Sequence, residues 1–367
     1  MSIAKPPNSA LGRSHRGNQR GVAILVAIGV VAVMLTAGLE LNRRIRGSVI
    51  GAIQAGERLV RAEMATSGVH AAMVMLINDR KQNQTDTLQE DWANPEKVAE
   101  MVELLAFDNG SVDVSIIDER GKIQINALVK FPEGQQFSAA QRFLWERLLD
   151  RVFSVFESEH DSDPNMIINS LKDWLDHGDD DAITGLSGAE SDYYQGLDPP
   201  YSAKNGPMDH LGELALVQGV TPELFSGAGG AIGLSSLMTV FGTLATPDGR
   251  FTYDGRINLS TADVTVLAAL LPAEHADLAE ALADYRTAKA DETFINDISR
   301  VQWYKNVPGA GDITIDSDLI TVSSDLFRIV ATATRNAGST TINAVVQREK
   351  EPDTGRWICK ILSWHEE

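Results

Sequence analysis

The most restrictive feature of this chain is an uncharged apolar segment close to its N-terminus. Residues 22–39 are 18 consecutive residues without an acidic or basic side chain. That length lies within the range that a helix needs to cross the hydrocarbon core of a membrane. The sequence after this segment lacks the small-residue cleavage site of a secretory signal peptide. We therefore expect the segment to stay in the mature protein as a single transmembrane helix.

The residues before this segment are basic and irregular. The first 21 residues contain four basic side chains and no acidic one, and their prolines and glycines argue against a helix. Basic residues before a first span favour a cytoplasmic location for that end of the chain. Three arginines soon after the span weaken this charge bias. We expect the N-terminus in the cytoplasm and everything after about residue 41 outside it.

The rest of the chain is strongly acidic. The net charge of the 367 residues is −19, and without the four basic residues of the leader it is −23. Such a charge is repelled by nucleic acid and by anionic lipid, so we expect no nucleic-acid partner. The single cysteine, Cys359, excludes an internal disulfide and a metal site built from several cysteines.

A helical pattern continues beyond the apolar segment. No proline occurs from residue 41 to residue 75, and apolar residues recur there at roughly helical spacing among charged neighbours. The pattern ends in a polar stretch at residues 78–87. We therefore predict one helix over residues 22–80, half in lipid and half an amphipathic stalk. The apolar stripe of the stalk needs a partner, and a sheet in the same chain is the simplest one.

Alternating apolar and polar residues predict such a sheet. Residues 111–128 alternate on both sides of the polar stretch from Asp118 to Gly121, which predicts a β-hairpin. The first two of three further strands are joined through the turn-favouring sequence Asn-Ala-Gly. These three predicted strands lie within residues 326–335, 340–349 and 356–364.

Between these two parts of the sheet the pattern is helical. Asp163 before a proline predicts a helix start, and Ser260 or Thr261 is expected to cap a later helix. Two segments, at 121–128 and 255–270, both begin with glycine and a basic residue and continue with an apolar-Asn-apolar step. This similarity is weak evidence for an internal repeat.

The predicted fold class is α+β. A long N-terminal transmembrane and stalk helix packs on an antiparallel sheet formed by residues 81–131 and 309–367. A large all-α domain, residues 132–308, is inserted in the sheet domain.

Six segments carry a resemblance to a known family. They are "RGVAILVAIGVVAVM", "LKDWLDHGDDD", "GAESDYY", "PPYSAKNGPMDHLGELALVQGV", "INLSTADVTVLAALL" and "SSDLFRIVATA". A basic leader that ends in glycine, followed by an apolar helix and a sheet, resembles a type IV prepilin. Together the segments resemble, in order and over nearly the whole chain, the K minor pseudopilin family of the type II (general) secretion system. This resemblance implies a pseudopilin sheet that carries an inserted helical (SAM-like) domain.

The resemblance also implies roles for three residues near the N-terminus. Prepilin peptidase is expected to cut after Gly21, so that the mature chain begins at Val22, where relatives more commonly have Met or an aromatic residue. Ordinary pilins carry a glutamate at the fifth mature position, and Val26 stands there. An unpaired carboxylate in an apolar helix bundle is costly, so a subunit with no neighbour above it is expected to lack one. Val26 fits either such a tip subunit or a lipid-facing residue of a plain anchor.

The second candidate site is the acidic segment at residues 173–194. Closely spaced carboxylates repel one another unless they are solvated or share a cation, and oxygen ligands on a glycine-containing loop suit calcium. The segment is not an EF-hand loop, because Ile183 and Thr184 stand where a ligand and a glycine are required. The family resemblance implies calcium here, and the alternative is a solvated acidic loop. The candidate ligands are Asp173, Asp176, Asp179, Asp181, Glu190 and Asp192.

From the resemblance we expect the chain to be a non-enzymatic component of the pseudopilus tip. It is expected to act in pseudopilus assembly and in export of folded proteins across the outer membrane. The expected partners are the minor pseudopilins I and J, other pseudopilins, prepilin peptidase and the inner-membrane secretion platform. The expected location is the inner membrane, crossed once, with the C-terminal body in the periplasm. Two alternatives remain. One is a minor pilin of a type IV pilus, and the other is a membrane-tethered periplasmic hydrolase that uses the carboxylates of the acidic segment.

Overall fold

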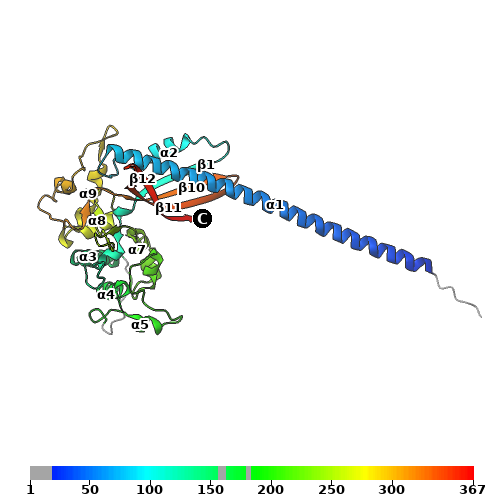
Figure 1. Cartoon of the computed structure of the whole chain (residues 1–367), viewed down its shortest axis with the longest axis horizontal. Helices are drawn as coiled ribbons and strands as arrows, with labels where there is room; N and C mark the ends of the chain where they lie inside the picture. The colour runs from blue at the N-terminus through cyan, green and yellow to red at the C-terminus, as the bar shows by residue number, and fades with distance from the viewer. Residues whose placement is uncertain (1–18, 156–162, 179–182) are drawn as a thin grey trace, which may run out of the picture. The chain divides into compact units, whose positions relative to one another are not determined.

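A computed structural model describes residues 19–155, 163–178 and 183–367 of the chain (Figure 1). Its first element is helix α1 (Gln19–Gln82), which is long and apolar enough to cross a membrane by length and composition. The helix begins before Gly21 and therefore includes the last residues of the predicted leader. The other leader residues, 1–18, lie outside the described residues. The described residues up to Val60 form one unit, and those from Arg61 onward form another.

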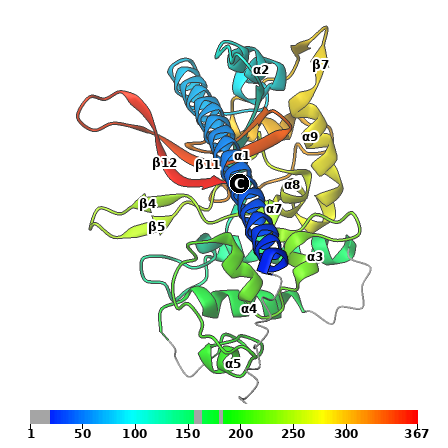
Figure 2. The ribbon, with the colours of Figure 1, turned by 90° about the vertical axis from the view of Figure 1, so that its right-hand side faces the viewer.

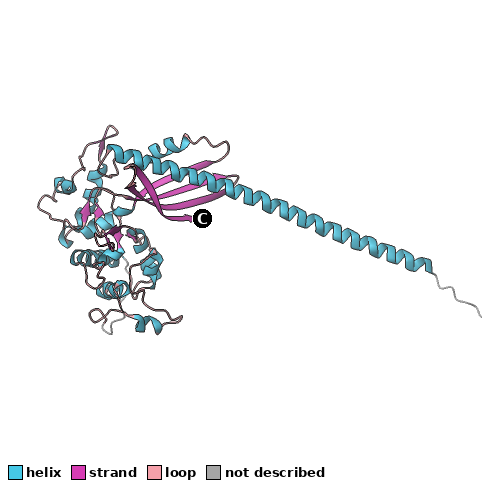
Figure 3. Ribbon diagram, in the orientation of Figure 1, coloured by secondary structure: helices cyan, strands magenta, loops and turns pink. Residues whose placement is uncertain are grey.

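Four strands form the main sheet of the second unit (Figure 3). The structure confirms the three predicted C-terminal strands, and the turn between the first two consists of Asn336 and Ala337. Both turn residues have positive φ angles, 49° and 60°, as a tight hairpin turn requires. In spatial order the strands are β1 (Ser111–Asp118), β10 (Leu326–Arg335), β11 (Gly338–Lys350) and β12 (Trp357–Glu366), each antiparallel to its neighbour.

The part of α1 from Arg61 onward covers one face of this sheet, as predicted for the stalk. Strand side chains alternate, so every second residue of β10 and β11 faces the helix. At Gly68 an added Cβ would lie 2.8 Å from the Val112 side chain, so glycine permits the close approach of helix and sheet. The core between them also receives residues of helix α2 (Pro95–Glu103). Its buried members include Ala65, Val69, Ala72, Leu76, Val98, Val102, Phe327, Ile329, Ala331, Ile342, Ala344 and Val346.

The predicted hairpin over residues 111–128 is wrong. β1 pairs with β10, whereas the next segment, β2 (Ile123–Gln124), pairs in parallel with β3 (Met238–Thr239). Between β1 and β2 the chain forms a turn of 3-10 helix, η2 (Glu119–Gly121), whose three residues are all buried. The charges of this polar stretch are paired inside the molecule rather than solvated. The chain therefore leaves the main sheet at this point and enters the inserted domain.

The inserted domain consists mainly of helices and short two-stranded ladders (Figures 2 and 3). Its described helices are η3 (Ile125–Leu128), α3 (Ala139–Val155), α4 (Pro164–Leu175), α5 (Ser191–Gln195), η4 (Leu211–Leu216), α6 (Pro222–Ser226), α7 (Leu234–Leu237), α8 (Val264–Leu270), η5 (Ala273–Leu278), α9 (Ala279–Thr287) and η6 (Val301–Asn306). Its other short strands are β4 (Thr243–Ala245), β5 (Phe251–Tyr253), β6 (Ile257–Asn258), β7 (Lys289–Ala290), β8 (Thr293–Phe294) and β9 (Ile320–Thr321). The domain has its own buried core, separate from that between α1 and the sheet.

The sequence predicts some of the helix starts of this domain correctly and others incorrectly. The Asp163 side chain accepts a hydrogen bond from the Asn165 N–H at 2.9 Å and caps α4, as predicted. The predicted cap of α8 at Ser260 or Thr261 is wrong, because α8 starts later and Asp263 caps it. Thr261 is instead used in a buried contact with the main sheet, described below.

The two segments with a shared glycine-basic start adopt corresponding structures. β2 follows the glycine of the first segment and β6 that of the second, and each forms a parallel two-residue ladder. In each segment a side-chain oxygen, of Gln124 or Asn258, accepts a hydrogen bond from the N–H two residues further on, at 2.8 and 3.1 Å. The helices that follow, α3 and α8, pack against each other. These correspondences support the interpretation of the two segments as a repeat.

Buried polar contacts around η2 tie the inserted domain to the main sheet. The Asp118 carboxylate accepts hydrogen bonds from Asn258 Nδ2 and Thr261 Oγ1, both at 2.7 Å. Burial raises the pKa of Asp118, and these hydrogen bonds oppose the shift. Burial alone would also raise the pKa of Glu119, but the nearby cations of Lys122 and Arg328 lower it below its ordinary value. The junction is therefore a network of partnered polar groups.

Candidate functional site

The N-terminal part of α1 exposes its apolar side chains. Gly21, Val22 and Val26 lie in its first turns, and Val22 and Val26 are 63% and 60% exposed. An added Cβ at Gly21, Gly29 or Gly38 would have no described atom within 4 Å beyond its own helix neighbourhood. An apolar helix needs lipid or other helices around it, and small residues let helices approach closely. This part of α1 therefore has the properties of a packing surface for a membrane or a helix bundle.

Three of the six predicted metal ligands come together in the inserted domain. Side-chain oxygens of Asp173, Asp176 and Glu190 lie within 4.8 Å of one another. Asp173 lies in α4, Asp176 is the residue that ends α4, and Glu190 is the residue before α5. The acidic cluster therefore joins the end of one helix to the start of the next.

Asp173 is the most deeply buried member of this acidic cluster. Its side chain is inaccessible to solvent, and its two oxygens each lie 3.1 Å from the backbone nitrogen of Thr184. An added Cβ at Gly188 would lie 2.0 Å from Asp173 Oδ2. Glycine at this position therefore lets the loop before α5 close over the carboxylate.

The carboxylate oxygens of the acidic cluster are suitable ligands for a hard divalent cation. Three carboxylates converge there, and Lys172 Nζ donates to Asp176 Oδ2 at 2.6 Å and to Thr184 Oγ1 at 3.0 Å. Carboxylate oxygens on a glycine-containing loop are typical calcium ligands. The residue types present are therefore compatible with a calcium ion.

Of the other three predicted ligands, the structure describes only Asp192. Asp192 is exposed on α5 and is not part of the acidic cluster. Asp179 and Asp181 lie outside the described residues. His177, the histidine of this segment, lies edge-on against Phe131 with the ring centres 5.7 Å apart. Among the described residues, His177 is not a member of the acidic cluster.

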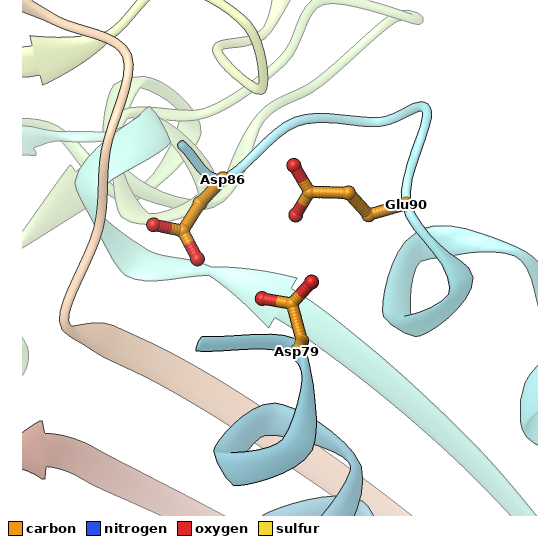
Figure 4. Close-up of side chains that lie close together, drawn as sticks. All are labelled: Asp79, Asp86 and Glu90. Carbon is orange, nitrogen blue, oxygen red and sulfur yellow. The ribbon is translucent and has the colours of Figure 1, made fainter. Parts of the chain in front are cut away.

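A second group of carboxylates, which sequence reasoning missed, lies near the C-terminal end of α1 (Figure 4). Asp79, Asp86 and Glu90 bring side-chain oxygens within 4.8 Å of one another. Arg348 of β11 contacts this group: its Nη1 lies 3.1 Å from Asp79 Oδ2, and its Nη2 pairs with Asp86 Oδ1. Because a guanidinium already partners two of the carboxylates, we interpret the group as an ion-pair network that ties α1 and the following loop to the sheet.

Two carboxyl groups of this network, those of Asp86 and Glu90, have pKa values above their ordinary range. Burial raises the pKa of Asp86 to about 6, although Arg348 opposes the shift. Burial and the neighbouring Asp79 raise the pKa of Glu90 to about 8. Trp92 Nε1 donates to Glu90 Oε2 at 2.7 Å. At neutral pH Glu90 is therefore mainly protonated, which reduces the repulsion among the three carboxyl groups.

One signal in the sequence points to this network. Ala344, Val346 and Arg348 follow one another at every second position of β11, so a charged side chain stands in the register that faces the core. A buried charge needs a buried partner. The partners, Asp86 and Asp79, lie 262 and 269 residues away in the chain, so local patterns do not identify them.

The inserted domain also carries the similarity to known proteins. Residues 121–228, from the end of η2 to just past α6, match the sequence model of the family described as Type II secretion system (T2SS), protein K. The matched residues are therefore similar to a domain of the type II secretion system protein K family. The acidic cluster of Asp173, Asp176 and Glu190 lies within the matched residues.

Named members of the K family are similar to the chain over a larger segment. The chain is 26% identical over 216 residues to type II secretion system protein K of Aeromonas hydrophila, and 24% identical over 219 residues to that of Klebsiella pneumoniae. These matches cover 57% and 58% of this chain. The chain spans 61% of the length of each of these relatives in the match.

A solved structure shares the fold. It is the crystal structure of the GspK-GspI-GspJ complex from the enterotoxigenic Escherichia coli type 2 secretion system. The likeness covers 86% of this chain and 98% of the compared chain, with a TM-score of 0.58 and 18% sequence identity. The predicted α+β pseudopilin fold is confirmed by this likeness.

Proposed function

We propose that the chain is a minor pseudopilin of a type II secretion system, and that it acts in pseudopilus assembly and in export of folded proteins across the outer membrane. The observation that carries this proposal is a K-family domain inserted between β1 and β10 of a pseudopilin sheet. Deletion of the gene is expected to abolish exoprotein secretion. Expression of the intact chain in the deletion strain is expected to restore it. Loss of type IV pili with normal secretion would instead select the minor-pilin alternative.

A position at the tip of the pseudopilus is supported by two features. The inserted domain adds a wide body beside the sheet, and such bulk clashes between stacked subunits of a helical filament. Val26 offers no carboxylate to a subunit above it. Both features are expected of the terminal subunit, which has no further subunit above it in the pseudopilus.

The N-terminal helix supports an inner-membrane location before assembly, with the body in the periplasm. The exposed apolar part of α1 is the membrane anchor, and prepilin peptidase removes the residues up to Gly21. Mass spectrometry of the membrane form is expected to find Val22 as the first residue. The variant Gly21→Leu is expected to keep the leader. The control Gly29→Ala, at an open position on the same helix, is expected to be processed normally.

The proposed partners are the minor pseudopilins I and J, followed by other pseudopilins and the inner-membrane secretion platform. The fold shared with a chain of the GspK-GspI-GspJ complex supports this choice. Co-expression of the chain with I and J pseudopilins of the same cell is expected to give a complex that survives purification. Failure of the chain to purify with either pseudopilin would contradict the tip assembly.

Calcium is the proposed ligand of the acidic cluster. Asp173, Asp176 and Glu190 would hold the ion, and the predicted ligands Asp179 and Asp181 are further candidates. The ion would neutralise the converging carboxylates and fix the loop before α5 to the end of α4. The contribution of the cluster is structural, because the Asp173 carboxylate is buried away from any substrate in solvent. A non-enzymatic role is therefore favoured over a hydrolase that uses these acids.

A further inference from the structure

A groove follows the free edge of the main sheet. β1 is the outermost strand in the order β1-β10-β11-β12, so one of its edges has no neighbouring strand among the described residues. The groove has a volume of about 480 Å³. Residues 111–115 of β1 form one wall, and α2 with the turn after it forms the other. This edge groove is within the size range of ligand-binding sites.

The strand wall of the edge groove offers backbone hydrogen-bonding groups. In an edge strand, alternate residues direct their N–H and C=O groups away from the sheet. The described residues provide no backbone hydrogen bond to residues 111–117 other than those of the ladder with β10. These groups can therefore pair with an added strand, as in proteins that bind peptides by strand addition.

The opposite wall of the edge groove is mainly apolar. It includes Ala99 and Val102 of α2, and Ala106 and Phe107 of the turn that follows. Ala99 is exposed, and its small side chain leaves the space between helix and strand open. Side chains at every second position of an added strand point to one face, so apolar residues at that spacing can pack against this wall.

The charged residues that line the edge groove indicate which kind of peptide segment can bind there. The charged residues in its lining are Glu103 from α2 and Asp113 from β1, both exposed carboxylates. The described lining includes no basic side chain. Complementary charge favours association and fixes the register of a bound segment. A basic segment therefore fits this groove better than an acidic or neutral one.

We propose that the edge groove binds an extended basic segment of a partner protein, which adds to the sheet as a strand beside β1. The segment has apolar residues at every second position and lysine or arginine near Glu103 and Asp113. This inference goes beyond the proposed function, because the groove is separate from the membrane packing surface of α1 and from the acidic cluster.

The probe is the fluorescein-labelled peptide KVTVKVT, and the protein is the full chain in detergent. Fluorescence anisotropy is expected to show saturable binding that weakens with added salt. Ala99→Trp fills the groove at an exposed position and is expected to weaken binding at least about tenfold. Glu96→Trp, on the exposed side of the same helix and outside the lining, is expected to bind as the wild type does. No binding of the peptide to the wild-type chain, or equal binding by the two tryptophan variants, would overturn the proposal.

A second measurement separates strand addition from simple apolar binding. Two forms of the peptide carry N-methyl groups on alternate backbone nitrogens, in the two possible registers. Only one register removes the donors that face β1, so one form is expected to lose binding at least about tenfold and the other to retain it. Equal binding by both forms would contradict strand addition. A chain that dimerises by itself, and becomes monomeric with Ala99→Trp, would show that a second copy occupies the groove and would overturn the proposed partner.

Discussion

Arg120 Nη1 donates to Asp254 Oδ2 at 2.8 Å, and each of these residues directly precedes the glycine of one of the two related segments. The contact therefore joins corresponding positions of the repeat. Arg120 Nε also donates to Asp325, just before β10, at 2.6 Å. A single guanidinium thus links η2, the second repeat segment and the main sheet.

Arg120→Met is expected to lower the free energy of unfolding by about 3 kcal/mol, because it leaves two carboxylates without their shared buried partner. The side chains of Arg120 and Asp254 are 9% and 8% exposed, so water replaces the lost contacts poorly. Urea unfolding of the full chain in detergent, followed by tryptophan fluorescence, measures the change. The control is Arg250→Met, which removes an exposed ion pair and is expected to leave the midpoint unchanged. Equal stability of the two variants would refute the role of Arg120.

The position of Arg120 also explains where sequence reasoning failed in the fold. The alternation in β10, β11 and β12 is local, and a short turn joins the first two, so the sequence predicts these strands correctly. The polar stretch from Asp118 to Gly121 has the composition of a solvent-exposed hairpin turn. Its charges are instead paired with Asp254, Asp325 and Arg328, which are far away in the chain. Composition does not distinguish a solvated charge from a charge with a distant partner.

The acidic cluster could be predicted in part because its members lie close together in the sequence. Asp173 and Asp176 lie close in sequence at the end of a predicted helix, and Glu190 follows Asp176 by 14 residues. Exposure could not be predicted in the same way. Asp192 lies only two residues after Glu190, yet it is directed to solvent because the first turn of α5 places the two on different sides.

The ion-pair network at the end of α1 predicts an unusual dependence of stability on pH. The pKa of Glu90 is about 8 in the folded chain and 4.5 in its ordinary state, so the folded chain binds more protons between these values. Stability therefore falls as the pH rises from about 5 to 8. Asp86, with a pKa of about 6, contributes in the same direction in the lower part of this range.

Glu90→Gln is expected to keep the hydrogen bond to Trp92 and to remove most of this slope. At pH 8 the variant is expected to be more stable than the wild type by about 1–3 kcal/mol, and at pH 5 nearly equal to it. Thermal unfolding of both chains between pH 5 and pH 8 tests this expectation. Parallel pH profiles for the two chains would show that Glu90 does not titrate in this range.

Val26→Glu tests the assembly of the N-terminal helix. At a tip position the new carboxylate has no amine above it, and an unpaired charge in an apolar bundle costs several kcal/mol. The variant is expected to purify with much less of the I and J pseudopilins than the wild type does. Val26→Leu, which stays apolar, is expected to assemble normally. Full assembly of Val26→Glu would indicate that a partner amine or water reaches this position, and that the tip interpretation is wrong.

Calcium binding to the acidic cluster predicts a stabilisation that depends on Asp173. At a calcium concentration of about 100 times the dissociation constant, the wild-type chain is expected to gain about 2.7 kcal/mol over its chelator-treated form. Asp173→Asn removes a converging charge and is expected to abolish this gain. Asp192→Asn, at the exposed position outside the cluster, is expected to retain it. Each variant is compared with and without calcium by thermal unfolding, so a loss of intrinsic stability in Asp173→Asn does not affect the result. A gain that persists in Asp173→Asn would place the ion elsewhere, and no gain in the wild type would contradict calcium binding by the chain.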